Sequence, residues 1–361
     1  MIDLQRHRKK FPIIDKEKNQ FHLHIESMST YNKIQYPLEG WIPEGDPDSG
    51  FAQWNDLPSG RYNEHEERES TTQPIVVPWS QFQTRVAEQK AVRDSLRNQG
   101  FCFRPWVIAD AFKVGWDDFS QGSRGSCAGC ATNHAVNAKL LLHLADGYRL
   151  QYKRFNPYHT WDLGKKDAGI RGEGASLSSM LTSANKRGMF DVEKVGTYEQ
   201  SLRNPPRYTA ELLADAEKCQ VGACYLGHFR GRELARVVFD CVAAGFPVSF
   251  GNSVAVSQQV NYVGPIKTAV NRGGWMHATA RIAYRKEANG VEYIAHQGSW
   301  GKFWEVGKHE KEPASVIWES FDTFSQQCSG RYADAFAICL VEGEFLEMDG
   351  FDPAPVRITR T

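Results

Sequence analysis

The sequence predicts an α+β fold in which a mainly helical first half packs face to face with a mainly β second half. Helical periodicity and capping signals mark three segments between about residues 127 and 244, and strand-like segments dominate after residue 245. Such a separation of helices and strands along one chain is typical of α+β proteins. The 361 residues are enough for one large or two ordinary domains with a sizeable core.

The N-terminal region differs in composition from the rest of the chain. Residues 1–75 alternate Pro, Gly and charged residues without helical or strand periodicity. A helix is then expected over residues 80–98, because it begins with a capping Ser and stops before a Gly. Its apolar stripe is thin, so we expect it to lie on the surface of another domain. These features predict an N-terminal arm over residues 1–100 with one helix, and three aromatic residues indicate that the arm packs against something: Trp41, Phe51 and Trp54.

Three helices and four strands are expected in the rest of the chain. The helices lie at about 127–145, 176–187 and 231–244, and the first two end at glycines. The strands lie at about 246–254, 277–285, 291–297 and 333–343. The second and third strands form a predicted hairpin, because Asn289-Gly290 between them is a strong turn signal. We predict one domain over residues 101–345, followed by a C-terminal tail over residues 346–361.

Composition limits the partners and the compartment that we expect. The sequence is 41% hydrophobic and 24% charged with a net charge of zero, so no overall field favours nucleic acid or a membrane surface. No apolar run approaches the roughly 20 residues that cross a bilayer, and the N-terminus lacks the apolar core of a secretory signal. Eight cysteines without an export signal indicate reduced thiols and a cytoplasmic origin.

One cysteine stands where a glycine-rich loop meets a helix. The segment DDFSQGSRGSCAGCATNHAVNAKLLLHL places Cys127 at the helix start, six residues after Gln121. The positive end of a helix favours a thiolate, and glycines before the cysteine let another chain approach closely. The backbone N–H of Cys127 and the side-chain amide of Gln121 can hold an oxygen that gains negative charge. The pattern fits nucleophilic attack on a carbonyl group.

The segment QGSRGSCAGCA resembles the nucleophile segment of the papain-like cysteine peptidases. A nucleophile of that kind needs an imidazole base, and His277, 150 residues after Cys127, is the candidate. His277-Ala278 matches the His-Ala pair of the family, and GSWG at residues 298–301 resembles its NSWG signature. Folding the predicted hairpin brings these two motifs together. The resemblance covers about residues 102–345.

The resemblance implies a papain-like two-lobed fold, with a helical lobe and an antiparallel β lobe, that hydrolyses peptide or isopeptide bonds in a polypeptide substrate. Cys127 would attack as a thiolate paired with the His277 imidazolium, and Gln121 would help to hold the oxyanion. No cofactor and no metal are implied. The resemblance also implies a glycine-containing substrate ledge, a pocket strand and an aromatic shield over the histidine: Gly172, Gly174, Ala175 and Ser176; Gly251; and Trp300.

The sequence departs from the family at two positions. Ala128 follows the nucleophile where the family usually has Trp, and Gly298 replaces the asparagine that orients the histidine. Gly298 has no side chain to fix the histidine tautomer. Gln297 carries the same amide but points to the opposite face of a regular strand, unless a bulge turns it. His296 lies on the same face as position 298 and is a second substitute, and a water molecule is a third.

The missing asparagine leaves two functional hypotheses. The chain is either a working peptidase with a changed third residue, or a catalytically weakened papain-like fold that serves as a binding or structural component of a larger assembly, such as a phage particle. Residues 1–100 would act as a propeptide in the first case. In the second they would act as a docking arm, and the chain would be part of a virion.

Two other interpretations of the cysteine segment are weaker. Cys127 and Cys130 have the spacing of a thiol-disulfide exchange motif, but a polar loop precedes them where that motif has a strand. A zinc site formed by these two residues and His134 lacks a fourth ligand. The glycine-rich GIRGEGAS lacks the ending of a phosphate-binding loop.

Overall fold

The computed structural model describes residues 78–116, 118–146, 152–304, 306–307 and 312–341, and the predicted α+β fold class is confirmed. The helices are α1 (Trp79–Asn98), α2 (Pro105–Phe112), α3 (Cys127–Ala145), α4 (Pro157–Asp167), α5 (Leu177–Arg187), α6 (Val192–Val195), α7 (Tyr198–Arg203), α8 (Ala210–Ala216), α9 (Gly231–Ala243) and α10 (Phe321–Cys328). The strands are β1 (Val221–Tyr225), β2 (Val248–Val256), β3 (Asn261–Val263), β4 (Ile266–Thr268), β5 (Asn271–Lys286), β6 (Glu292–Gln297), β7 (Val316–Ser320) and β8 (Ala333–Val341).

All eight described strands form one sheet in the order β1-β8-β2-β5-β6-β7-β4-β3. Neighbouring strands are antiparallel except β4 and β7, which are parallel. The predicted hairpin is confirmed, because β5 and β6 pair from Lys286–Glu292 at the turn to Ala280–Gln297 at the far end. A bulge between Arg281 and Ala283 shifts the register within this hairpin. The longest strand, β5, therefore lies in the middle of the sheet between β2 and β6.

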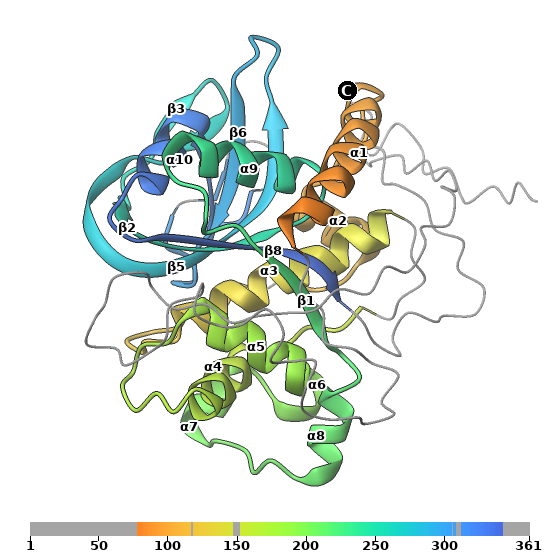
Figure 1. Ribbon diagram of the computed structural model, residues 1–361, viewed down its shortest axis with the longest axis vertical. Coiled ribbons are helices and arrows are strands. Elements are labelled where there is room, and N and C mark those ends of the chain that lie inside the picture. Colours follow the sequence, from red (N-terminus) through yellow and green to blue (C-terminus); the bar gives the residue numbers. More distant parts are fainter. Residues whose placement is uncertain (1–77, 117, 147–151, 305, 308–311, 342–361) are drawn as a thin grey trace, which may run out of the picture.

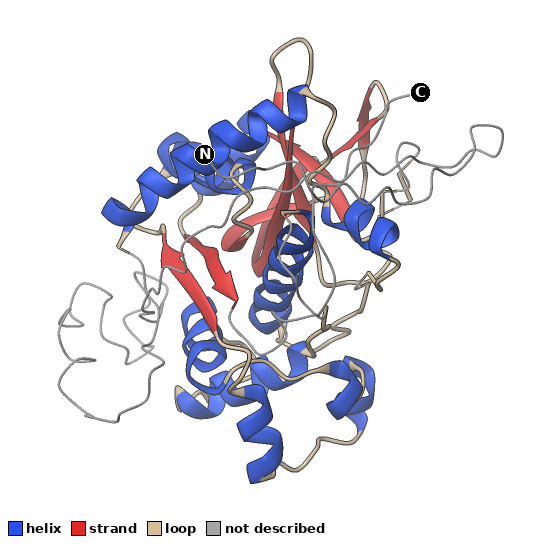
Figure 2. Cartoon of the chain, turned by 90° about the vertical axis from the view of Figure 1, so that its right-hand side faces the viewer, coloured by secondary structure: helices blue, strands red, loops and turns tan. Residues whose placement is uncertain are grey.

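Helices cover both faces of the sheet. Buried residues of α2, α3, α4 and α5 share one hydrophobic core with β5, β6 and β8, and α3 makes the main contact with β5. Buried residues of α1, α9 and α10 share a second core with the other face of the sheet. Figure 2 shows most strands in the upper half of the molecule and a group of helices in the lower half. The sheet is thus packed on both sides by apolar side chains, which explains why residues 277–285 of β5 and nearly all of β6 are buried, whereas the first part of β5 is largely exposed.

The molecule has the two lobes that the sequence predicts. Helices α4 to α8 lie together below the sheet in Figure 1, and α3 runs between them and the strands. All residues of α3 after Cys127 are buried, as expected for a helix between two layers. The start of α3 therefore lies where residues of both lobes can reach it.

The predicted arm helix corresponds to α1. Phe82 and Val86 of α1 are buried against α9, and the Phe82 ring contacts Phe246 at a centroid distance of 4.7 Å. The rest of the predicted arm, including its aromatic residues, lies before residue 78 and outside the described residues, as does the predicted tail over 346–361. Within the described ranges, no helix combines the length and the apolar character that crossing a membrane requires.

Candidate active site

Cys127 is the first residue of α3 and differs from the other cysteines in its exposure. All eight cysteines lie in described segments, and Cys127 is the only one that is not fully buried. Burial raises the pKa of several of the others, for example of Cys219 to about 12. Cys127 is therefore the thiol that a reagent or a substrate reaches most easily.

The loop before Cys127 packs tightly against the predicted substrate ledge. A Cβ atom on Gly125 would lie 2.7 Å from the backbone carbonyl of Glu173, so only glycine fits there. The Glu173 side chain pairs with Arg124 at 3.0 Å, and its carbonyl accepts a hydrogen bond from Trp161 Nε1 at 3.1 Å. These contacts fix the ledge beside the cysteine.

The ledge itself is open. Gly172 and Gly174 are exposed, and a Cβ on either would meet nothing within 4 Å. Ala175 packs against the first core, and Ser176 caps the start of α5. The predicted ledge residues therefore present free backbone next to the loop of Cys127, which suits the approach of an extended peptide.

Strands β2 and β5 bring His277 to the same place. In the antiparallel register Asn252 pairs with His277, and Gly251 pairs with Ala278. The backbone of Ala278 lies close enough to the thiol of Cys127 to lower its pKa by hydrogen bonding. The nucleophile candidate and the residue after the histidine candidate, 151 positions apart in sequence, are thus neighbours.

His277 is enclosed by two tryptophans. Its ring stacks on Trp300 at a centroid distance of 4.1 Å with an angle of 11° between the planes, and Trp275 contacts it at 4.8 Å. Only 8% of His277 is exposed. The Trp300 ring thus covers one face of the His277 imidazole.

Gln121 is tied to the segment that carries Trp300. The backbone N–H of Gln121 donates to the carbonyl of Ser299 at 2.7 Å, and the hydroxyl of Ser299 donates to the Gln121 side-chain oxygen. The side-chain nitrogen donates to the carbonyl of Arg124 at 2.7 Å. An isolated bridge between Ser120 and Trp300 completes this link. One N–H of the Gln121 amide remains for a further acceptor.

The electrostatics of the thiol differ from the prediction. Burial raises the pKa of Cys127, and the backbone groups of Ala278, Ala128 and Cys127 only partly offset this rise. Burial lowers the pKa of His277 to about 3, and the neighbouring His296 and Arg281 side chains lower it further. Among the described side chains, no hydrogen bond joins Cys127 to His277. Burial thus outweighs the helix end at the thiol, and both shifts favour neutral groups over the expected thiolate–imidazolium pair.

The two substitutes for the missing asparagine lie on opposite faces of β6. Gln297 pairs with Ala280, whereas His296 pairs with Arg281, on the β5 face that also carries His277. The bulge lies beyond these pairs, so it does not turn Gln297 towards the histidine. Position 298 and His296 are close, since a Cβ on Gly298 would lie 3.9 Å from His296 Nε2.

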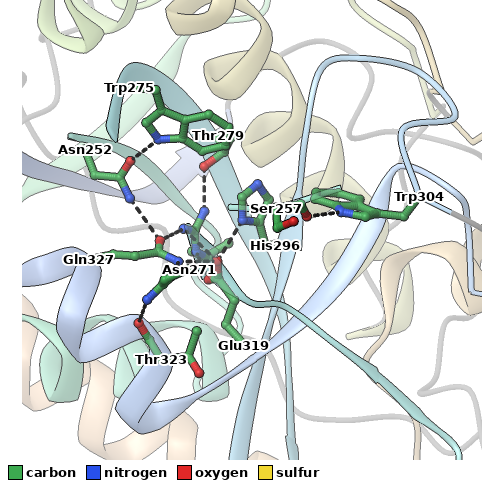
Figure 3. A network of polar contacts seen from close by, with 11 residues as sticks. Asn252, Ser257, Asn271, Trp275, Thr279, His296, Trp304, Glu319, Thr323 and Gln327 are labelled. Carbon is green, nitrogen blue, oxygen red and sulfur yellow. Dashed lines mark hydrogen bonds and ion pairs between the residues drawn. The ribbon is translucent and has the colours of Figure 1, made fainter. Parts of the chain in front are cut away.

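A buried polar network that was not predicted from the sequence joins His296, Glu319 and Gln327 (Figure 3). It consists of Asn252, Asn271, Trp275, Thr279, Arg281, His296, Glu319 and Gln327. Arg281 and Glu319 form its ion pair at 2.8 Å, and both are fully buried. Arg281 lies four residues after His277 in a predicted strand, so a lone Arg on the histidine's face was a signal for a buried acidic partner. No sequence signal pointed to Glu319 or Gln327 in particular. Within the described part of the chain, no three metal-ligating side chains come together.

No model of a known protein family matches the sequence, and no curated protein is similar to it. Among solved structures, a digestive procathepsin L 3 from the larval midgut of Tenebrio molitor has a TM-score of 0.42 and 16% identity over 62% of this chain and 66% of that chain. Xylellain, a cysteine protease from Xylella fastidiosa, has a TM-score of 0.43 and 16% identity over 62% of this chain and 82% of that chain. The proform of the ragweed pollen cysteine protease Amb a 11 has a TM-score of 0.40 and 18% identity over 62% of this chain and 61% of that chain.

The match spans less than two thirds of the first and the third of these proteins. All three are cysteine proteases or their precursors by description. At TM-scores of 0.40 to 0.43 and identities of 16% to 18%, these similarities assign no family, activity or substrate to the chain.

Proposed function

We propose that this chain is a cysteine peptidase that hydrolyses peptide or isopeptide bonds. The observation that carries the proposal is the position of the Cys127 thiol, at the start of α3 and beside the backbone of Ala278, the residue after His277. Gln121, the open ledge at Gly172 and Gly174, and Trp300 lie around the same point. These groups supply a nucleophile, a base, an oxyanion donor and free backbone for a substrate chain.

The neutral state of both groups suggests the order of the first step. The substrate displaces solvent and the Cys127 sulfur attacks its carbonyl carbon, while His277 takes the thiol proton. The backbone N–H of Cys127 and the free N–H of Gln121 stabilise the oxyanion. The His277 imidazolium then protonates the leaving amine, and the C–N bond breaks. Water, deprotonated by neutral His277, releases the acyl group and restores the thiol.

One set of observations favours a second candidate function. The raised pKa of Cys127, the lowered pKa of His277 and the glycine at position 298 all oppose a reactive thiolate. A chain of this kind, weakened in catalysis, would serve as a binding or structural component of a larger assembly such as a virion, with residues 1–100 as the docking arm. Residues 1–77 lie outside the described residues, so this role depends on sequence alone.

Selective alkylation separates the two candidates. If the peptidase proposal holds, iodoacetamide near neutral pH labels Cys127 well ahead of the other seven cysteines, and His277→Ala slows this labelling by roughly 100-fold, the usual contribution of a positioned base. Peptide mapping by mass spectrometry after timed labelling measures both rates. Slow labelling of Cys127 that His277→Ala leaves unchanged contradicts the peptidase proposal and favours the assembly role.

A further inference from the structure

The space beside Gly298 is bordered by a histidine ring. A Cβ atom at this position would make ordinary contacts with Trp304 at 3.5 Å and 3.6 Å, and its next neighbour would be His296 Nε2 at 3.9 Å. The sequence has no amide here, but an imidazole nitrogen reaches the edge of the place that an amide side chain would fill. His296 is fully buried.

The protonation state of His296 is set by Glu319. His296 Nδ1 lies 2.8 Å from Glu319 Oε1, and the pKa of Glu319 is lowered to about 2 by Arg281 and His296 despite its burial. The carboxylate is therefore ionised and accepts, so Nδ1 of His296 carries a proton. Burial lowers the pKa of His296, and Arg281 lowers it further, so the ring is neutral near pH 7. Its Nε2 is then an acceptor, and it is buried without a hydrogen-bond partner among the described residues.

His277 has a ring nitrogen that needs a hydrogen-bond partner. Its Nε2 is also buried without a hydrogen-bond partner among the described residues. If His277 is to take the thiol proton on Nδ1, its own proton must sit on Nε2. Two buried nitrogens on the same face of β5 and β6, a donor on His277 in that tautomer and an acceptor on His296, are thus both unsatisfied, and the acceptor lies beside Gly298. Burying both without a contact would be costly.

A second branch of the network runs from Glu319 through Gln327 and Asn252 to Trp275 (Figure 3). Gln327 donates to Glu319 at 2.7 Å, and Asn252 donates to Gln327 at 2.9 Å. Trp275 Nε1 donates to Asn252 at 2.7 Å, and the Trp275 ring contacts His277. Glu319 therefore holds two rings. It contacts the His296 imidazole directly, and through Gln327 and Asn252 it holds the Trp275 indole, which packs on His277.

We infer that His296, held by Glu319, replaces the missing asparagine as the positioning residue of His277. His277 Nε2–H donates to His296 Nε2, directly or through one water molecule in the space beside Gly298. This contact keeps His277 in the tautomer whose Nδ1 can accept the thiol proton. Arg281 neutralises Glu319, so the whole arrangement carries no net charge in the core. The inference rests on the proposed peptidase function.

Labelling of Cys127 with iodoacetamide tests the inference in the full chain. His296→Ala removes the acceptor and should slow the alkylation of Cys127 by roughly 10- to 100-fold, because His277 loses its tautomer preference. Glu319→Gln should slow it as well. Adding Gly298→Asn to His296→Ala should restore most of the rate, because the new amide fills the space that the ring bordered. Far-UV circular dichroism and thermal unfolding check that each variant folds.

Glu312→Gln is the matched control. Glu312 is also fully buried in the β lobe, but its carboxylate accepts from Trp318 Nε1 and does not touch His296. This variant should keep the rate of Cys127 labelling within about twofold of the unchanged chain, within the scatter expected for a substitution away from the site. If His296→Ala labels as fast as this control while His277→Ala is slow, the positioning role is wrong and the peptidase proposal stands. If His277→Ala has no effect either, both fall.

The tautomer of His277 can be measured in the unchanged chain, so this test does not depend on whether any variant folds. In the unchanged chain labelled with 15N-histidine, the inference expects the proton of neutral His277 on Nε2 and that of His296 on Nδ1. The 15N chemical shifts of the two rings distinguish these states. A proton on Nδ1 of His277 overturns the inference, even if His296→Ala fails to fold.

Discussion

At the scale of single residues, neighbours hold both ends of the Gln121 side-chain amide. Ser299 holds its side-chain oxygen, and the carbonyl of Arg124 takes one hydrogen of its side-chain nitrogen. The amide therefore cannot rotate freely, and its orientation is settled before a substrate arrives. Such preorganised donors cost no reorganisation when charge develops on a carbonyl oxygen.

Gln121→Ala should therefore separate acyl transfer from simple thiol reactivity. We expect turnover of a cleavable peptide to fall by about 100-fold, because one oxyanion donor is lost. Alkylation of Cys127 by iodoacetamide should change little, because that reaction forms no oxyanion. Parallel rates of peptide cleavage and of alkylation check this. An equal loss in both would mean that Gln121 acts on the thiol and does not act on the oxyanion.

The site was predictable where local signals and matched motifs agreed. Cys127, His277, Gln121 and Trp300 were all named from short motifs, and the structure brings them together. The raised pKa of Cys127 was not predictable, because desolvation depends on which lobe covers the thiol. The role of Glu319 was hidden for the same reason, since a single acid in a strand gives no sign of its buried partners.

At the scale of elements, the loop before α3 and the ledge before α5 act as one unit. The Gly125 backbone packs directly on Glu173, and Arg124 adds an ion pair that is partly exposed and contributes little by itself. The position of Cys127 along the sheet thus depends on a close backbone contact between two loops. The glycine-rich segments before α3 and before α5 are both visible in the sequence, but their contact with each other is not.

Gly125→Ala should disturb this contact, whereas Gly174→Ala should not. The new Cβ of Gly125→Ala would lie 2.7 Å from the Glu173 carbonyl, so we expect a loss of about 1–3 kcal/mol in the free energy of unfolding and slower labelling of Cys127. The Cβ of Gly174→Ala meets nothing within 4 Å, so stability should stay within about 0.5 kcal/mol. Urea unfolding measures both. Equal stability of the two variants would contradict the tight contact.

The elements that the sequence predicted are those with strong local signals. Helices α1, α3, α5 and α9 begin and end close to the predicted residues. Of these four, however, only α5 has a side-chain cap, at Ser176, and the expected cap Ser80 is wrong, because α1 begins after Pro78. The short helices α6 and α7 and the three-residue strands β3 and β4 carry no sustained periodicity. Strand β5 starts at Asn271, six residues before the predicted start. Its first residues are rich in Gly and polar residues, so they carry no strand signal and pair only because β2 lies alongside.

At the scale of the whole molecule, histidines of several elements are buried. Burial lowers the pKa of His134 to about 3, of His159 to about 4 and of His277 to about 3, against 6.5 when exposed. His134 lies on α3, His159 on α4 and His277 on β5, so the effect belongs to the double-layered architecture and not to one site. Each of these rings is neutral in the folded chain over most of the pH range.

The described fold should consequently lose stability as pH falls from about 6.5 towards 4. In this window the unfolded chain binds protons on these histidines and the folded chain does not, so acid favours unfolding. Each histidine should remove roughly 1–2 kcal/mol from the free energy of unfolding between pH 7 and pH 5. Urea titrations at a series of pH values measure the slope.

His134→Phe tests the origin of this slope with little change in packing. The His134 ring stacks on Phe119 at 4.5 Å, and both of its nitrogens are buried without a hydrogen-bond partner among the described residues. A phenyl ring keeps the stacking, removes two unsatisfied polar atoms and cannot titrate. We expect this variant to lose roughly 1–2 kcal/mol less than the unchanged chain between pH 7 and pH 5. If the two chains lose the same amount, buried neutral histidines are not what makes the fold sensitive to acid.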